Sequence, residues 1–446
     1  MIEVENYHKH TNDSNVYTPD STVSYIDYFN RALEVGSKCI TTTEHGWCGN
    51  NFDIYLQLEK FNKKLIKEGK NPLKFVFGGE FYWVKDRSEK DKSNCHIIIL
   101  ARNENGRKKI NKIMSQCNKD GYYYKPRLDL DLIMSLPSND VFITTACVAF
   151  WKYEDIDDIV LKLNEKFPYF FLEVQAHHTD KQRNINKHIL ELSNRYNIPL
   201  IAGMDSHMIN ENQAIERDDF LKSKKISYDD EQGWFMDYPS GDEFFKRFQE
   251  QGILSNEQIK QAIDNTLLIR NFEDIIYDKS IKVPTLYPNL NQEEKDNKFK
   301  QLINEKWIET RDDIPIEMHD KYINEIRKEV NEIIGCNMSD YFMTTYETIK
   351  LGIEKYGGQL TKSGRGSGCS EYINKLLGFT NVDRISARVT MYPERFLTKE
   401  RILDSHACPD IDHNVAEREP FKLAQAELFG SAYDLIAFGT LKYKSA

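Results

Sequence analysis

The sequence predicts an α/β fold for its first part and a second, α+β domain after it. Two observations carry this prediction. Short β-rich apolar runs alternate with longer amphipathic stretches through about residue 210, which is the pattern of βα units. A polar, helical stretch follows, and Val283-Pro284 and Tyr287-Pro288-Asn289 then break the pattern. We therefore place the domain boundary there, with residues 1–285 as the first domain and residues 286–446 as the second.

The predicted strands of the first domain are seven short runs. They are Ile2–Tyr7, Cys39–Thr43, Phe75–Gly79, Ile97–Leu100, Val141–Thr145, Phe170–Val174 and Leu200–Ala202. Helical patterns lie between them, such as Ser24–Leu33 and Ile54–Ile66. Seven parallel strands with intervening helices would close into a barrel or wind into an open sheet.

Residue types that bind metal ions lie beside nearly every predicted strand. They are His8, His10, Asp20, Glu44, His45, Glu80, His96, Cys147, His177, His178, Asp205 and His207. Functional side chains of β/α barrels gather where strands end, because those loops meet on one face. Any one of these histidines alone would more often be an ordinary core or loop residue. As a set, they predict a polynuclear site for Zn²⁺, Mn²⁺ or Fe²⁺.

The composition is that of an ordinary soluble globular protein, with 40% hydrophobic and 29% charged residues. No apolar run approaches the roughly 20 residues that span a bilayer, so we expect no membrane partner. The eight cysteines form no C-x-x-C pair, and a reducing, cytoplasmic setting therefore fits best. The formal charge of -10 disfavours nucleic-acid binding over the whole surface but allows a basic groove on an acidic body.

Two motifs in the second domain predict a two-metal nucleotidyl-transfer site. Asp410 and Asp412 are one residue apart, so on an extended strand they point to the same face and can hold one metal pair. The turn Gly364-Arg365-Gly366-Ser367, opening a helix, offers backbone N–H groups and a guanidinium to a triphosphate. Together the motifs indicate phosphoryl chemistry at paired metal ions.

The first domain resembles the PHP (polymerase and histidinol phosphatase) family. The resemblance rests on His8-x-His10, Thr43-Glu44-His45-Gly46, Gly79-Glu80, His96 before an apolar strand, Cys147 and Asp205-x-His207. It implies a distorted (β/α)7 barrel over about residues 1–210, with a helical extension to residue 285, that hydrolyses phosphoesters at metal ions. The implied ligands are His8, His10, Asp20, His45, Glu80, His96, Cys147, Asp205 and His207. His177 lies outside that set, and we expect it to support a ligand or lie at the surface.

From about residue 290 the chain resembles the polymerase part of C-family replicative polymerases, the bacterial DNA polymerase III alpha subunits. The resembling stretches keep the family's order: Tyr322–Gly335, Asp340-Tyr341-Phe342, Gly364-Arg365-Gly366-Ser367, Pro393-Glu394-Arg395-Phe396-Leu397, Pro409-Asp410-Ile411-Asp412 and Phe438-Gly439-Thr440. The resemblance implies the N-terminal part of an α+β polymerase palm, belonging to a DNA-directed DNA polymerase in replication. Primer-template DNA and deoxynucleoside triphosphates are its implied partners.

The same resemblance implies roles for individual residues. Asp410 and Asp412 would bind catalytic Mg²⁺, and Gly364 to Ser367, with Arg365 and Arg395, would bind the incoming triphosphate. In this family the thumb, the fingers and the rest of the palm with its third aspartate come later in the chain. We therefore expect primer extension to need that remaining part, whereas the barrel would act as a 3′–5′ proofreading exonuclease.

Two other interpretations stay open. One is a stand-alone PHP phosphoesterase, and the other is a non-catalytic module that completes a split polymerase. The Lys-, Asn- and Ile-rich usage favours a bacteriophage replication gene. Separately, Tyr122-Tyr123-Tyr124-Lys125-Pro126-Arg127 mixes aromatic and basic residues, a combination that clamps single strands in other proteins but is weak evidence by itself.

Overall fold

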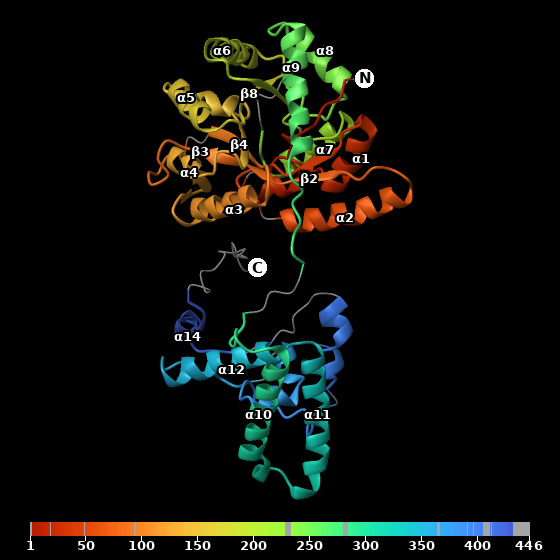
Figure 1. The fold of residues 1–446 in the computed structure, drawn as a ribbon, viewed down its shortest axis with the longest axis vertical. Coiled ribbons are helices and arrows are strands. Elements are labelled where there is room, and N and C mark those ends of the chain that lie inside the picture. The colour runs from red at the N-terminus through yellow and green to blue at the C-terminus, as the bar shows by residue number, and fades with distance from the viewer. Residues whose placement is uncertain are drawn as a thin grey trace. The chain divides into compact units, whose positions relative to one another are not determined.

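The computed structural model divides the chain into two compact units, Met1–Tyr277 and Asp278–Ala446 (Figure 1). It describes residues 2–17, 19–48, 50–92, 95–227, 233–279, 284–363, 366–389, 391–395, 397–404, 411 and 413–430. Each unit has its own hydrophobic core. None of the described helices combines the length and the apolar character needed to cross a membrane.

The first unit is a mixed α/β structure, as the sequence predicted. Its strands are β1 (Cys39–Thr41), β2 (Lys74–Val76), β3 (Gly78–Trp83), β4 (Cys95–Ala101), β5 (Tyr122–Tyr123), β6 (Lys125–Leu128), β7 (Val141–Thr144), β8 (Phe170–Gln175) and β9 (Leu200–Gly203). Its helices are α1 (Tyr25–Val35), α2 (Asn51–Lys67), α3 (Glu104–Lys119), α4 (Leu130–Met134), α5 (Ile156–Lys166), α6 (Asp180–Tyr196), α7 (Asn212–Ser223), α8 (Gly241–Gln251) and α9 (Asn256–Thr266). Helices α1 and α2 confirm the predicted helical patterns. Figure 1 shows helices such as α3, α5, α6 and α9 surrounding the strands.

The strands form a distorted barrel, which confirms the predicted fold class. One sheet has the order β5-β6-β3-β4-β7-β8-β9, and β1 pairs with β2 beside it. Single parallel bridges join Lys9 to Ser206 and His45 to Glu80, linking the first segment of the chain to the end of β9 and β1 to β3. Between the first segment and β1, side chains close the seam, because the Lys9 backbone N–H donates to Thr43 Oγ1 at 3.0 Å and Lys9 Nζ to Thr41 Oγ1 at 2.7 Å.

The prediction that all seven strands run parallel is wrong at one strand. β4 is antiparallel to both of its neighbours, β3 and β7. The run Ile2–Tyr7 also forms no ladder in the described structure, and its neighbour Lys9 makes a single bridge. The reversal matters for function, because it brings the start of β4 to the end of the barrel where the parallel strands finish. His96, at the start of β4, therefore lies beside Tyr82, near the end of β3.

Alternation along the strands divides the barrel interior into an apolar layer and a polar layer. On β8, Phe171 faces the inner apolar cluster, and Glu173 and Gln175 follow on the same face two and four residues later. On β4, Ile98 and Leu100 belong to the same inner cluster, and His96 shares their face. The polar layer thus lies at the carboxyl end of the parallel strands, which is where functional sites of such barrels form.

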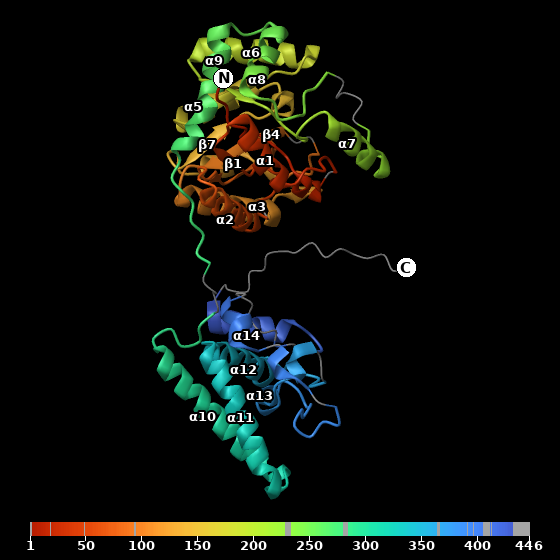
Figure 2. The same cartoon turned by 90° about the vertical axis from the view of Figure 1, so that its right-hand side faces the viewer.

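The second unit is helical in its described part. Its helices are α10 (Gln292–Thr310), α11 (His319–Gly335), α12 (Ser339–Glu354), α13 (Tyr372–Leu376) and α14 (Glu419–Phe429). Figures 1 and 2 show α10 and α11 side by side, and the Trp307 ring stacks on Tyr322 with 6.2 Å between ring centroids. One antiparallel bridge joins Leu360 to Val415.

Candidate metal centre

The structure places all nine of the predicted ligands at one end of the barrel. They come from seven places in the chain: the segment after Tyr7, the loop before α1, the end of β1, β3, the start of β4, the end of β7 and the end of β9. The residues are His8, His10, Asp20, His45, Glu80, His96, Cys147, Asp205 and His207. All are buried or nearly so.

Glu80 lies at the middle of the group. Its Oε1 is 3.4 Å from His8 Nε2 and 3.1 Å from His96 Nδ1. Its Oε2 is 2.6 Å from His45 Nδ1 and 3.4 Å from His10 Nε2. Each oxygen of this carboxylate therefore faces two imidazoles, so Glu80 would be a central ligand if metal ions bind here.

Asp205 holds the histidines that come from the chain's first segment. Its Oδ1 is 3.2 Å from His8 Nε2, 3.3 Å from His10 Nε2 and 3.8 Å from His207 Nδ1. Asp205 adopts a left-handed φ of 50°. Asp tolerates this conformation better than most residues, and such strain gathers at functional sites.

Asp20 and Cys147 lie at two sides of the group. Asp20 Oδ2 is 3.0 Å from His207 Nε2 and 3.3 Å from His45 Nε2. Cys147 Sγ is 3.5 Å from His96 Nδ1. Both residues therefore contact a histidine of the central group directly.

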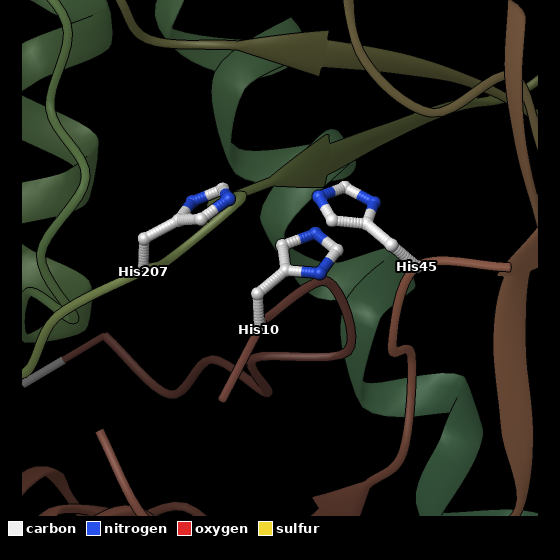
Figure 3. Close-up of side chains that lie close together, drawn as sticks. All are labelled: His10, His45 and His207. Atoms are coloured by element: carbon white, nitrogen blue, oxygen red, sulfur yellow. The ribbon is translucent and has the colours of Figure 1, made fainter. Parts of the chain in front are cut away.

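The donor atoms fit divalent cations. Three groups of three side chains have their ligand atoms within 4.8 Å of one another: His10, His45 and His207 (Figure 3); His8, His10 and Glu80; and His45, Glu80 and His96. Within the described residues, the buried His8 Nε2, His10 Nε2, His45 Nδ1 and both Glu80 oxygens face one another or Asp205, but none of these contacts has the geometry of a hydrogen bond. Buried polar atoms are normally satisfied, so such a concentration indicates a site built for a ligand.

Burial and charge set the protonation of this group. Burial alone would raise the pKa of Glu80, but His96 and His45 outweigh it and hold that pKa well below its usual range. Burial, together with His45 and His207, lowers the pKa of His10 to about 3. An ionised Glu80 and a neutral His10 are the forms that bind a metal ion.

Three further charged residues support the ligands; the sequence analysis gave no role to Glu173 and Arg217, and it named Glu44 only as a candidate metal-binding residue. Glu173 accepts hydrogen bonds from Tyr7 Oη and pairs with His8 Nδ1, both at 2.7 Å. Arg217 contacts Asp20 Oδ1 at 2.6 Å. Glu44 accepts hydrogen bonds from the Thr11 side chain at 2.8 Å and from Tyr25 Oη at 2.6 Å. Glu173 had a local signal, since it is a carboxylate inside an apolar strand, whereas Arg217 had none.

Gly203 makes room for Glu173. A Cβ at position 203 would lie 2.1 Å from Glu173 Oε1, and the hydrogen bonds of that carboxylate prevent it from moving aside. We expect Gly203→Ala to destabilise the chain by about 1–3 kcal/mol and to weaken metal binding, because His8 loses its support. Thermal unfolding and metal titration test this. In a Glu173→Ala background the same substitution should cost little further, and an equal cost in both backgrounds would contradict the explanation.

His177 is buried rather than on the surface. Its side chain is 2% exposed, its ring stacks on Trp234, and its Nδ1 accepts a hydrogen bond from the Phe235 backbone at 3.0 Å. Burial lowers the pKa of His177 to about 4, and the charges of Asp205, His8 and His207 also act on it. It is therefore a buried residue within the electric field of Asp205 and His8, and its described contacts are to Trp234 and Phe235.

Most of the residues predicted for nucleotidyl transfer lie outside the described part of the chain. This holds for Gly364, Arg365, Asp410 and Asp412. Gly366 begins a 3-10 helix, Gly366–Cys369, the side chain of Ser367 is not described, and Arg395 ends another 3-10 helix, Pro393–Arg395. The structure therefore does not test whether these residues meet.

The structure does show what holds the start of α13, just after the Gly-Arg-Gly-Ser turn. The buried Glu329 accepts hydrogen bonds from the backbone N–H groups of Tyr372 and Ile373, each at 2.9 Å. Arg384 Nε donates to Glu329 Oε1 at 2.6 Å, and Arg384 also contacts Glu325 at 2.8 Å.

Known families match both units. The model of the PHP domain matches residues 6–177, and that of the bacterial DNA polymerase III alpha NTPase domain matches residues 297–446. The PHP match and the clustered donor atoms indicate a metal-binding site in the barrel.

Two curated relatives and one solved structure are similar to the chain. The DNA polymerase III subunit alpha of Borreliella burgdorferi is 27% identical over 448 residues, covering 96% of this chain and 37% of that protein. The subunit of Chlamydia pneumoniae is 26% identical, with 96% and 38% covered. An amidohydrolase from Chromobacterium violaceum has a TM-score of 0.28 at 13% identity, with 46% of this chain and 88% of that one covered, too little to bear on the fold. The chain thus spans less than two fifths of the length of these curated relatives and is a DNA polymerase III alpha-like N-terminal region, a PHP domain followed by a DNA polymerase III alpha NTPase domain.

Proposed function

We propose that this chain is part of a DNA-directed DNA polymerase whose barrel hydrolyses phosphodiester bonds and removes nucleotides from a 3′ end. The observation that carries the proposal is the convergence of nine donor side chains on one end of the barrel, centred on Glu80. The similarity to DNA polymerase III alpha subunits supports a setting in replication, where a 3′–5′ hydrolytic centre would proofread.

The described residues would have different roles at this centre. Three donor sets, built on Glu80, His10 and His45, would hold Zn²⁺, Mn²⁺ or Fe²⁺. Such ions supply a water of lowered pKa and positive charge for the phosphoester oxygens. Asp20 and Asp205 add negative charge beside the histidines, and Glu173 orients His8 through Nδ1.

The second unit would contribute to nucleotidyl transfer. We assign Asp410 and Asp412 to Mg²⁺, and Gly364, Arg365, Gly366, Ser367 and Arg395 to the incoming triphosphate. The family match over residues 297–446 supports this assignment. Primer-template DNA is the proposed partner, and the thumb, the fingers and the rest of the palm would complete the enzyme. Because 96% of this chain covers only 37% of the Borreliella relative, we expect no templated extension by this chain alone.

The barrel's activity can be tested with a 5′-labelled primer that has a mismatched 3′ end and is annealed to a template. The purified chain is incubated with Mn²⁺, Zn²⁺ or Fe²⁺ and without nucleotides. We expect shortening from the 3′ end by the parent chain and none by Asp205→Ala/His207→Ala, because both substitutions remove donors from the centre.

Three results of that assay would count against the proposal. Shortening by the double variant at the parent rate would point to a contaminating nuclease. No shortening by a metal-loaded parent would favour the non-catalytic module. Hydrolysis of small phosphate esters without any action on the primer would favour a stand-alone phosphoesterase.

A further inference from the structure

The hairpin of β5 and β6 presents exposed aromatic side chains close to the metal centre. Tyr122 is 54% exposed and Tyr124 is 67% exposed, although both are large and largely apolar. Tyr124 sits at the turn with a left-handed φ of 62°, a conformation that a bulky residue adopts only where its surroundings impose it. Lys92 Nζ lies 4.5 Å from the centre of the Tyr124 ring. The hairpin tip thus combines aromatic faces with a cation.

Hydrogen bonds from the buried side chain of Arg127 hold the hairpin in place. This residue is 4% exposed, and its guanidinium donates to the backbone oxygens of Gly121 at 2.8 Å, Arg87 at 2.7 Å and Asp91 at 3.0 Å. Arg127 also pairs with Tyr82 of β3 in the sheet. The charge of Arg127 is therefore used in contacts within the protein and is not available to a ligand. These contacts hold the hairpin that carries the tyrosines in place, which lowers the entropy cost of binding a ligand.

Lys125 lies between the hairpin tip and the metal centre. Its Nζ lies 4.2 Å from the centre of the Tyr82 ring, and that ring is 5.3 Å from His96 and 6.1 Å from His45. Burial and Lys152 lower the pKa of Lys125, and the carboxylate of Glu80 acts in the opposite direction. Lys125 is therefore within the electric field of the central carboxylate. Lys125 and the Tyr82 ring therefore lie between the hairpin tip and the donor histidines His96 and His45.

We propose that the hairpin Tyr122–Leu128 binds the 3′-terminal nucleotides of a single DNA strand, with Tyr122 and Tyr124 stacking on bases and Lys125 facing the phosphate that enters the metal centre. Base–aromatic stacking tolerates any sequence, and lysines suit the strand's phosphates. A proofreading site must accept an unpaired end of any sequence, so this surface deepens the proposed function and rests on it. It also reconciles the net charge of -10 with DNA binding, because the cations are needed only here.

The test measures strand binding and bond cleavage separately. Binding of a fluorescein-labelled oligo(dT) of about 12 nucleotides, with phosphorothioate linkages that resist cleavage, is followed by anisotropy in Mn²⁺. Cleavage is followed with bis(p-nitrophenyl) phosphate, which is too small to reach from the metal centre to Tyr122 and Tyr124. The variants are Tyr122→Ala and Tyr124→Ala. The matched control is Tyr196→Ala, an exposed tyrosine beside Arg195 at the end of α6, just before β9 begins and so at the other end of the barrel.

We expect each hairpin variant to weaken oligo(dT) binding about tenfold or more and to leave hydrolysis of the small diester unchanged, with Tyr196→Ala like the parent. Binding within twofold of the parent in both hairpin variants, or equal weakening by Tyr196→Ala, would overturn the inference. If the parent cleaves the small diester but does not bind oligo(dT), this inference fails and the hydrolytic centre stands. If the tyrosines govern binding but the metal-loaded parent cleaves nothing, the proposed hydrolysis fails and the binding surface stands.

Discussion

Replacing Glu80 with glutamine should lower phosphodiester hydrolysis by this chain about a thousandfold or more. The carboxylate faces four imidazoles, two at each oxygen, and no other described carboxylate faces as many histidines of the centre. Glutamine keeps the size of the side chain but loses the charge and offers only one oxygen. Cations that would take Glu80 as a ligand would therefore bind weakly or not at all.

Rates on the mismatched primer and metal content per chain measure this effect together. Glu191→Gln, an exposed position on α6, is the matched control and should behave as the parent. The Glu80→Gln variant should also remain folded, because the substitution removes a buried charge rather than a packing group. Full activity in Glu80→Gln would show that the hydrolytic site lies elsewhere in the chain.

Replacing Glu329 with alanine should destabilise the second unit by about 3–5 kcal/mol. Its carboxylate satisfies two backbone N–H groups at the start of α13 and pairs with the largely buried Arg384. Removing it leaves both donors without a partner and takes one of two carboxylates from Arg384. The first turn of α13 should therefore open.

Hydrogen exchange read by mass spectrometry separates the two units in this experiment. We expect the peptide around Tyr372 and Ile373 to lose protection and the strands of the barrel to keep theirs. Glu325→Ala is the control, because its side chain is 33% exposed, pairs with Arg384 and satisfies no backbone group of α13, so it should cost less than about 1 kcal/mol. Equal effects of the two substitutions would show that Glu329 does not anchor this helix.

The sequence pattern located the ligand residues better than it described the sheet that carries them. His96 was identified because it precedes an apolar strand, but in an all-parallel barrel that position would lie at the wrong end. Hydrophobic periodicity carries no information on strand direction, so the antiparallel β4 could not be predicted from it. The family resemblance identified His96 as a ligand, and the antiparallel direction of β4 explains why His96 reaches the site.

The residues that support the ligands were mostly beyond reach from sequence. Arg217 comes from α7, nearly two hundred residues after the Asp20 that it contacts, and no local pattern links them. Gly203 gives no periodic signal, because its role is to leave space for Glu173. Contacts of this kind depend on packing between distant segments. The tyrosine-rich hairpin was visible as a composition, but its position beside the centre was not.

Metal content of the purified chain, measured by mass spectrometry after reconstitution and desalting, tests the central claim most directly. The account predicts more than one Zn²⁺, Mn²⁺ or Fe²⁺ per parent chain, since there are three donor sets, and Glu80, His10 and His45 each belong to two of them. It also predicts a clear loss of metal in Glu80→Gln. A parent chain that retains less than about 0.1 ion would contradict the account, because nine converging donors would then hold no metal.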